Sequence, residues 1–311
     1  FRRTAERDYE NLPDDALRIL EAYANGVNAV IDGAGAGLPV EFALLRRKPE
    51  HWTVLDSLAY VRMLTWSMSY GWTNDLIQSR LVDALGPDAA RDLMLEYPAN
   101  LPTIIGAPQS SRNTASDIAR DFAPGQGGSN AWAISPGQSA TGSALLANDP
   151  HLPLRIPSIW YENHLVGGEY NATGVSFPGL PAVVIGHNSD IAWGITLSFA
   201  DVETLVPIEL DSSGNVVGDV EVFEESISIK GRSTPVLEKV VVTQAGPIIP
   251  QVDLGTGTAA AISASALRPS QDVTGFLRLN IASNWDEFQS ACADLRGAHL
   301  NIVYADTEGN I

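Results

Sequence analysis

The sequence has a single cysteine and no long apolar run. Cys292 cannot form a disulfide within the chain, and the paired Cys or Cys/His spacings typical of zinc sites are missing. Its place in an amphipathic helical pattern predicts core packing instead. No stretch approaches the roughly 18 consecutive apolar residues of a membrane-spanning helix, so we expect no membrane segment.

Basic residues are also scarce. The 311 residues include 19 Lys and Arg against 37 Asp and Glu, a formal net charge of −18. This balance argues against nucleic-acid binding, because neutralising phosphates requires clustered Lys and Arg. Hydrophobic residues make up 45% of the chain and can supply a sizeable core. We therefore expect a globular chain of one large domain or two.

The ends of the sequence lack the usual marks of a complete precursor. The chain begins at Phe1 without an initiator Met, and its first residues have no apolar signal-peptide core. We expect it to be part of a longer protein, truncated at both ends, and a signal peptide lost from it is compatible with this start.

Hydrophobic spacing divides the chain into three parts. Apolar residues three and four apart predict helices from Asn11 to Gly33, over 55–68 and over 75–85. From Pro98 to Gly128 the periodicity stops, and Pro, Ser, Asn and Gly predict an exposed linker that is open to proteolysis. After this linker, β-rich runs predict strands at 130–135, 143–147, 159–166, 182–185, 191–196 and 236–243.

The end of the chain has a helix and a strand of its own. The segment from Asn284 to Glu287 resembles a capping box that opens a helix to Leu295. A strand over 301–305 and a turn at 308–310 follow, and a further turn is expected at 213–215.

Common nucleophile motifs are missing as well. The chain has no Gly-x-Ser-x-Gly, Ser-x-x-Lys or His-Glu-x-x-His motif and no phosphate-binding glycine loop. The five histidines are scattered singly, and a lone histidine is more often structural than catalytic. These absences argue against the usual serine-hydrolase and metalloprotease mechanisms.

Ser129 stands out because it follows Gly127 and Gly128 directly and begins a predicted strand. Cleavage after Gly128 would give this serine a free α-amino group with a pKa of about 8. That amine could take the proton of the serine's own hydroxyl, so one residue would supply both nucleophile and base. The alternative is that Gly-Gly-Ser is an ordinary loop tripeptide.

Further motifs follow this serine in order and with regular spacing. They read Gly-Ser-Asn-Ala-Trp-Ala at 128–133, Asn-Asp-Pro-His at 148–151, Phe-Pro-Gly-Leu-Pro at 177–181, Gly-His-Asn-Ser-Asp-Ile-Ala-Trp-Gly-Ile-Thr at 186–196 and Asn-Ile-Val-Tyr-Ala-Asp at 301–306. In these motifs the chain resembles the penicillin acylase (penicillin amidase) family of N-terminal nucleophile hydrolases. The resemblance spans nearly the whole chain.

The resemblance implies a fold and a chain organisation. We expect an α+β protein, an αββα sandwich of two antiparallel sheets preceded by an α-helical segment. Residues 1–105 would be the C-terminal part of the α chain, and residues 106–128 a spacer removed or displaced on maturation. Residues 129–311 would be the N-terminal part of the β chain. Both chains would come from one precursor that cuts itself between Gly128 and Ser129.

The resemblance also implies roles for individual residues. Attack by Ser129 on an amide creates an oxyanion, which needs donors already aimed at it. These would be the backbone N–H of Leu197 and the side-chain amide of Asn301, and His151 would hold the new α-amino group. Alternatively, Asn301 bonds local backbone at a strand end, and His151 has a packing or strand-capping role.

Family members often bind one calcium ion, although the catalytic chemistry requires no cofactor. Asp201 fits a ligand position after the Trp-Gly signature, and Asp75 could be its helical partner. Thr204 stands where a second carboxylate is expected, with Glu203 one position away. Calcium takes six to eight oxygen ligands, so a lost carboxylate would weaken such a site. Solvated surface acids are the alternative.

Together these expectations describe an amidohydrolase that cleaves a linear amide of a small-molecule substrate through an acyl-enzyme on Ser129. The substrates expected from the resemblance are β-lactam side-chain amides or acyl-homoserine lactones, and His151 weighs against a strict penicillin-G type. We expect a periplasmic or extracellular protein. A noncatalytic periplasmic module with an acylase-like fold is the alternative, which retention of Ser129 and Asn301 argues against.

Overall fold

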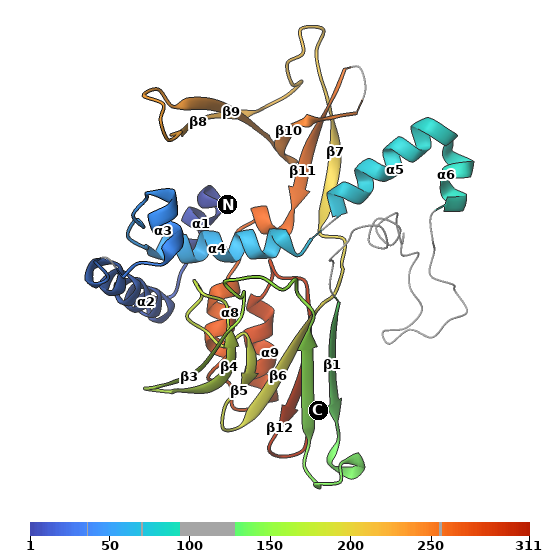
Figure 1. Cartoon of the computed structure of the whole chain (residues 1–311). Helices are drawn as coiled ribbons and strands as arrows, with labels where there is room; N and C mark the ends of the chain where they lie inside the picture. The colour runs from blue at the N-terminus through green and yellow to red at the C-terminus, as the bar shows by residue number, and fades with distance from the viewer. Residues whose placement is uncertain (36, 70, 94–127, 255–256) are drawn as a thin grey trace. The chain divides into compact units, whose positions relative to one another are not determined.

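The computed structural model describes residues 1–35, 37–69, 71–93, 128–254 and 257–311. They belong to two compact units. The first unit comprises Phe1–Met68, Gly127–Ala200 and Ala266–Ile311, and the second comprises Ser69–Gln126 and Asp201–Ser265. Each unit combines helices with an antiparallel sheet, so the chain is an α+β protein, as the sequence predicts (Figure 1).

The first unit opens with four helices, two of which, α2 and α4, are those that the apolar spacing predicts. The four are α1 (Arg2–Tyr9), α2 (Asp14–Gly33), α3 (Val40–Leu45) and α4 (Val54–Ser67). α2 ends at the predicted glycine. α4 begins with a capping box in which Thr53 and Asp56 bond each other's backbone N–H groups. The C-terminal end of this helix lies against the segment that leads into the last strand.

The sheet of the first unit has five antiparallel strands in the order β12-β6-β5-β4-β3. Its strands are β3 (Tyr161–Gly167), β4 (Tyr170–Ser176), β5 (Ile185–His187), β6 (Ile191–Leu197) and β12 (Leu300–Asp306). The sequence places a strand at 182–185, whereas the strand begins only at Ile185. β4 is not predicted, because Asn171, Thr173 and Gly174 interrupt its apolar pattern.

Two further layers cover this sheet. The hairpin of β1 (Ser129–Ile134) and β2 (Leu145–Pro150) packs against β6 and β12 on one face. On the other face lie α8 (Asp272–Leu279) and α9 (Trp285–Asp294), where the Phe288 ring lies 4.8 Å from that of Tyr304 on β12 (Figure 1). Helices, sheet and hairpin form successive layers of the predicted αββα sandwich.

The core of the first unit lies between the sheet and its helices. Trp193 on β6 is fully buried, and its indole N–H donates to the carbonyl of Val184 at 3.0 Å. The N-cap predicted for α9 is present, since the Asn284 side chain accepts from Glu287 N–H at 3.0 Å. Cys292 on α9 is half-buried and packs against this core, as predicted, and burial raises the pKa of its thiol to about 11.

The second unit contains α5 (Gly71–Leu85), α6 (Pro87–Leu93) and a second five-stranded antiparallel sheet. Its strand order is β7-β11-β10-β9-β8, with β7 (Glu203–Glu209), β8 (Glu221–Ile227), β9 (Val236–Thr243), β10 (Gly246–Asp253) and β11 (Thr258–Ala264). α5 packs against β7. The turn predicted at 213–215 is present, because Asp211 N–H donates to the Asn215 carbonyl at 2.8 Å.

Two of the predictions concern whole segments, namely membrane-spanning helices and the spacer. None of the helices in the described parts of the chain is long and apolar enough to cross a bilayer. The predicted spacer at 106–128 lies outside the described residues except for Gly128, so its boundaries remain a prediction.

Candidate functional site

Ser129 is the first residue of β1, directly after the predicted cleavage point. Its hydroxyl donates to the carbonyl oxygen of Gly128 at 2.7 Å. The same oxygen accepts the backbone N–H of His151 at 2.8 Å, from the other arm of the hairpin. The hydroxyl therefore lies beside the peptide bond that it would attack, and the N–H of His151 is the donor left to polarise the carbonyl of that bond during the attack.

Asn148 fastens this hairpin to β6. Its side-chain oxygen accepts the N–H of Ile195 at 2.8 Å, and its NH₂ group donates to the Ile195 carbonyl at 3.1 Å and to the Asn130 carbonyl at 2.8 Å. The Asn148 amide thus bonds the β6 backbone at Ile195 as a neighbouring strand would, at a position beyond the end of β5. Gly194 permits this approach, since a Cβ there would lie 2.9 Å from that of Asn148.

Asn301 lies on the face of the sheet that carries the hairpin. Side chains two residues apart on a strand share a face, and Val303 lies on the hairpin side beside Gly194. Tyr304 points to the opposite face, toward α9. The Asn301 amide donates to the Thr196 hydroxyl at 3.1 Å and lies 3.4 Å from the Leu197 carbonyl oxygen. The side chain is exposed.

The N–H of Leu197 points to the same edge of β6 as Asn148. Ser198 N–H donates across to the His299 carbonyl at 3.1 Å, so the N–H groups of Ser198 and Thr196 face β12. Successive N–H groups on a strand point to opposite edges, which directs those of Ile195 and Leu197 toward the hairpin. The two predicted oxyanion donors therefore lie at adjacent strands, at the end of β6 and the beginning of β12.

His151 directly follows β2 and lies across the hairpin from Gly128. Its imidazole is paired with a carboxylate, because Nε2 lies 2.7 Å from Oδ2 of Asp149, and both side chains are exposed. The backbone of His151, rather than its ring, contacts the predicted scissile carbonyl. His151 therefore lies beside the proposed nucleophile. The role predicted for its ring stays a prediction.

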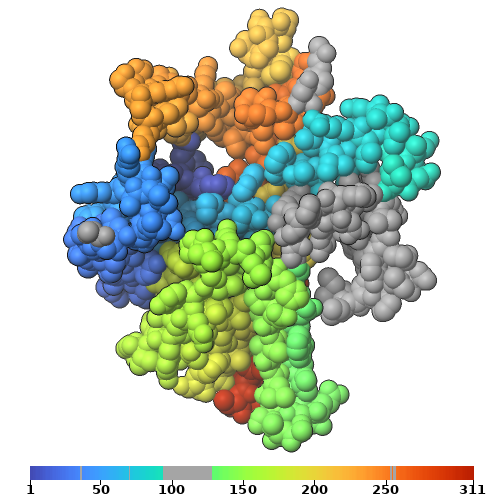
Figure 2. All heavy atoms as spheres, viewed as in Figure 1, coloured from blue at the N-terminus to red at the C-terminus, as the bar shows by residue number. Residues whose placement is uncertain are grey.

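A cavity of about 520 Å³ lies at the opposite end of the hairpin. It is lined by the hairpin turn, the β5–β6 turn and the end of β12. Figure 2 shows the red C-terminal residues against the green hairpin in this region. None of the predicted catalytic residues lines this cavity, so it lies apart from the proposed nucleophile.

The predicted calcium ligands belong to the second unit. Glu203 begins β7, is 1% exposed, and neither of its carboxylate oxygens has a hydrogen-bond partner among the described residues. Burial raises the pKa of Glu203 to about 7, and the nearby Asp201 raises it further, while Ser69 and the N–H of Trp72 lower it. Glu203 is thus a buried acid without a built-in counter-charge.

Asp75 and Asp201 lie close to each other in the same region. Asp75 on α5 accepts the N–H of Leu205 at 2.8 Å, and burial and the nearby Asp201 both raise its pKa. A side chain on Gly71 would come within 2.8 Å of Asp201 Oδ1, which shows how closely α5 approaches these acids. In the described parts of the chain, no three His, Cys, Asp or Glu side chains converge on one metal-sized point.

Several residues that shape the site have no assigned role in the sequence prediction. Asn148 and Gly194 fall inside predicted motifs, but only the structure shows that one anchors the hairpin and the other makes room for it. Arg62, Asp8 and Asp272 carry no motif at all. They lie 54 and 210 positions apart in sequence, and only folding brings them together.

Comparisons with known proteins agree on one family. The family model described as Penicillin amidase matches residues 1–311. Acyl-homoserine lactone acylase QuiP of Pseudomonas aeruginosa is 29% identical, over 98% of this chain and 40% of that protein. Penicillin acylase 2 proenzyme of Pseudomonas sp. (strain SE83) is 30% identical, over 79% of this chain and 34% of that protein.

A solved structure gives the same result. Thermostable penicillin G acylase from Alcaligenes faecalis matches with a TM-score of 0.51 and 26% identity, covering 58% of this chain and 33% of that one. The chain spans about 40% of the length of the curated acyl-homoserine lactone acylase that it matches.

Proposed function

This chain belongs to the penicillin amidase family, and we propose that it carries the catalytic centre of an amidohydrolase whose nucleophile is Ser129. The observation that carries the proposal is the position of the Ser129 hydroxyl, 2.7 Å from the Gly128 carbonyl oxygen. A strand start held in this way presents the peptide bond to its own serine, as an intramolecular acyl shift requires. Cleavage would leave Ser129 as an N-terminus.

In the proposed reaction, the α-amino group of Ser129 takes the hydroxyl proton as the oxygen attacks a linear amide. Leu197 N–H and the Asn301 amide stabilise the oxyanion, and their placement at adjacent strand ends supports these roles. The amine leaves with a proton, and water then releases the acid from the serine ester. The backbone of His151 holds the Gly128 carbonyl before cleavage, and its ring is assigned to the new α-amino group.

The proposed substrates are small amides with a detachable acyl chain. Relatives carry the names acyl-homoserine lactone acylase and penicillin acylase, which supports acyl-homoserine lactones or β-lactam side-chain amides as the class. The name proenzyme in one relative supports α and β chains made from a single precursor. We place the protein in the periplasm or outside the cell.

A calcium ion is part of the proposal for the second unit. Asp75, Asp201 and Glu203 are its proposed ligands, and the buried Glu203 carboxylate without a hydrogen-bond partner among the described residues supports a cation there. The acids do not form a complete ligand set by themselves. Backbone carbonyls and water would have to supply the other oxygens. The ion would stabilise the fold, not take part in the reaction.

Intact mass of the purified protein tests the nucleophile. Wild type should be found as two chains cut between Gly128 and Ser129, and Ser129→Ala should stay uncut. Ser143→Ala, an exposed serine in the same hairpin connection, is the matched control and should be cut like wild type. The wild type should release free amine from an N-acyl-homoserine lactone or penicillin G, while Ser129→Ala should not. A folded, uncut and inactive wild type would favour the noncatalytic module.

A further inference from the structure

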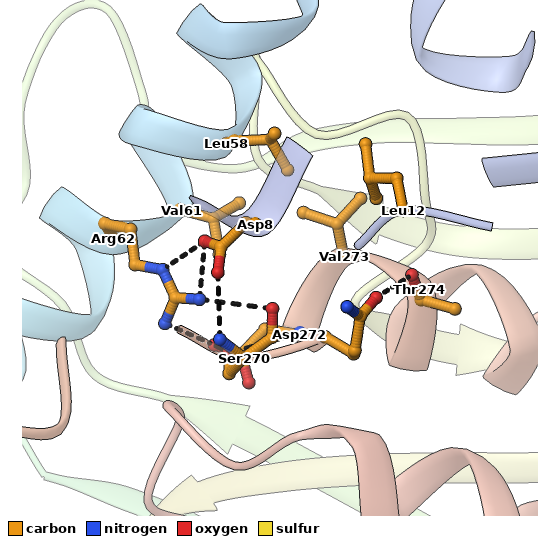
Figure 3. A pocket seen from close by; sticks show the side chains of 10 residues that line it. Asp8, Leu12, Leu58, Val61, Arg62, Ser270, Asp272, Val273 and Thr274 are labelled. Atoms are coloured by element: carbon orange, nitrogen blue, oxygen red, sulfur yellow. Dashed lines mark hydrogen bonds and ion pairs between the residues drawn. The ribbon is translucent and has the colours of Figure 1, made fainter. Parts of the chain in front are cut away.

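A buried ion network joins two N-terminal helices of the first unit to the start of α8 (Figure 3). Arg62 on α4 donates from Nε and Nη2 to Oδ2 of Asp8 on α1, at 2.7 and 2.6 Å. Its Nη1 lies 3.4 Å from Oδ2 of Asp272, the first residue of α8. The three side chains are 2–4% exposed.

Ser270 completes the network. Its backbone N–H donates to Asp8 at 2.9 Å, its carbonyl accepts from Arg62 at 3.2 Å, and its hydroxyl donates to Asp272 at 2.6 Å. One guanidinium and two carboxylates leave a formal charge of −1, which these neutral donors help to offset. Burial still raises the pKa of Asp8. Ion networks of this kind are costly to bury, and apolar residues of similar volume often stabilise a fold as well.

The second oxygen of Asp272 reaches the segment that leads into β12. Oδ1 accepts the backbone N–H of Gly297 at 2.9 Å and lies 3.4 Å from that of Ala298. There is no room for a side chain at Gly297, since a Cβ there would collide with the Asp272 carboxylate and lie 2.8 Å from Nη1 of Arg62. The backbone four residues before Asn301 is therefore packed directly on the ion network.

α4 meets the same segment a second time at His299. The imidazole Nε2 lies 3.1 Å from the carbonyl oxygen of Met68, at the C-terminal end of α4. A carbonyl can only accept, so Nε2 carries the proton. Burial lowers the pKa of His299, which keeps the ring neutral. The His299 carbonyl in turn accepts Ser198 N–H at 3.1 Å, which sets the register of β12 against β6.

We propose that Asp272, held in place by Arg62 and Ser270, is a positioning residue for the Asn301 amide and acts through its hydrogen bond from Gly297 N–H. α4 belongs to the segment before the predicted cleavage point, and it would fix the geometry of an oxyanion donor that lies after it. This inference rests on the proposed function. It also accounts for a buried charge network at a place where apolar packing would serve stability equally well.

Two substitutions of Asp272 separate positioning from charge. Asp272→Asn keeps an oxygen that can accept Gly297 N–H, whereas Asp272→Ala removes it. We expect Asp272→Ala to lower kcat per processed molecule about tenfold or more, with KM changed less than about twofold, because misplacing a catalytic group by 1 Å can cost about 100-fold. Asp272→Asn should keep kcat within about threefold of wild type, which is the rescue that a positioning role requires.

Hydrogen exchange of the peptide spanning 297–303 gives a second readout that does not depend on activity. Exchange there should be faster in Asp272→Ala than in wild type and close to wild type in Asp272→Asn. If Asp272→Ala does not fold, Arg62→Lys replaces it, since lysine keeps the charge but cannot reach both carboxylates with one fork. Arg62→Lys should show the same changes as Asp272→Ala, a lower kcat and faster exchange at 297–303, but smaller.

Unchanged kcat per processed molecule in the Asp272→Ala or Arg62→Lys protein would overturn the inference, even if its melting temperature fell. Unchanged exchange at 297–303 would overturn it as well. A wild type that neither cuts itself nor hydrolyses any amide would overturn the proposed function. In that case the exchange measurement would still show whether the network holds this segment, so the two failures can be told apart.

Discussion

Each unit buries acidic side chains, two in the first unit and Glu203 in the second, and the two groups of acids around them are balanced in different ways. In the first unit, Asp8 and Asp272 share the Arg62 guanidinium and take further hydrogen bonds from Ser270. In the second unit, neither carboxylate oxygen of Glu203 has a hydrogen-bond partner among the described residues, and Asp201 lies near enough to raise its pKa. One group carries its own cation, whereas the carboxylate of Glu203 has no cation paired with it among the described residues.

The difference shows what burying an acid requires. A carboxylate out of water needs a cation, several N–H donors or a proton. Asp8 and Asp272 have the first two, while Glu203 keeps its proton up to a pH of about 7 unless a cation replaces it. The comparison therefore predicts that the first group responds to loss of Arg62, whereas the second responds to added calcium.

The largest expected effect is that of removing the cation from the first group. Arg62→Met leaves two carboxylates, each at most 4% exposed, without their counter-charge. Breaking a buried ion pair from one side costs about 3–5 kcal/mol. Urea unfolding should show that loss as a lower midpoint with an unchanged slope. A loss below about 1 kcal/mol would mean that water reaches the network.

Supplying a cation to the second group should have the next largest effect. Calcium at about 100 times its Kd would stabilise the protein by about 2.7 kcal/mol if one ion binds only the folded state. The melting temperature should rise with calcium and fall with EDTA. Asp201→Asn should blunt this response, and Asp294→Asn, which removes an acid of the first unit, should leave it intact. Identical melting temperatures in calcium and EDTA would remove the ion from the proposal.

The pH dependence of the metal-free protein should reveal Glu203 with a smaller effect. Its folded-state pKa of about 7 lies above the ordinary 4.5, so the folded state binds the proton more tightly than the unfolded state. Its contribution is full below pH 4.5 and is lost as the pH rises to about 7. In Glu203→Gln this fall of unfolding free energy should be smaller, because only the raised pKa values of Asp8 and Asp75 would still contribute to it. The measurement is urea unfolding in EDTA across this window, and an equal fall in both proteins would assign it to other groups.

The smallest effect is expected for an ion pair on the surface of the first unit. Arg278 on α8 pairs with Asp294 on α9 at 2.5 Å, but the Arg278 side chain is 47% exposed. Exposed pairs contribute about 0–1 kcal/mol, so Arg278→Met should leave the unfolding free energy within that range. This variant is the matched control for Arg62→Met. If both cost the same, burial would not explain the difference between the pairs.

The sequence predicted the parts of the fold that local patterns determine. The α2 and α4 helices follow from apolar residues three and four apart, and the N-cap of α9 follows from Asn284 and Glu287. β4 escaped prediction because its polar residues and Gly174 hide the alternation of a strand that is partly buried on both faces. α8 escaped as well, since a helix of eight residues gives a short periodic signal.

The candidate site was predictable only as far as motifs extend. The motifs place Ser129, Leu197 and Asn301 in order, but they do not show that Asn148 ties the hairpin to β6. The ion network could not be predicted, because Arg62 finds its partners across 54 and 210 positions. Such partners are determined by packing, which no local spacing encodes.

The bond between His151 N–H and the Gly128 carbonyl has a consequence for timing. The hairpin must form as far as His151 before this carbonyl has its second donor, and β6 must be in place before Asn148 can anchor the hairpin to Ile195. Under the proposed cleavage, a chain in which β6 has not yet folded is protected from being cut, because its scissile bond is not yet presented. Maturation would then report that folding has advanced past β6, and no separate factor would be needed to time it.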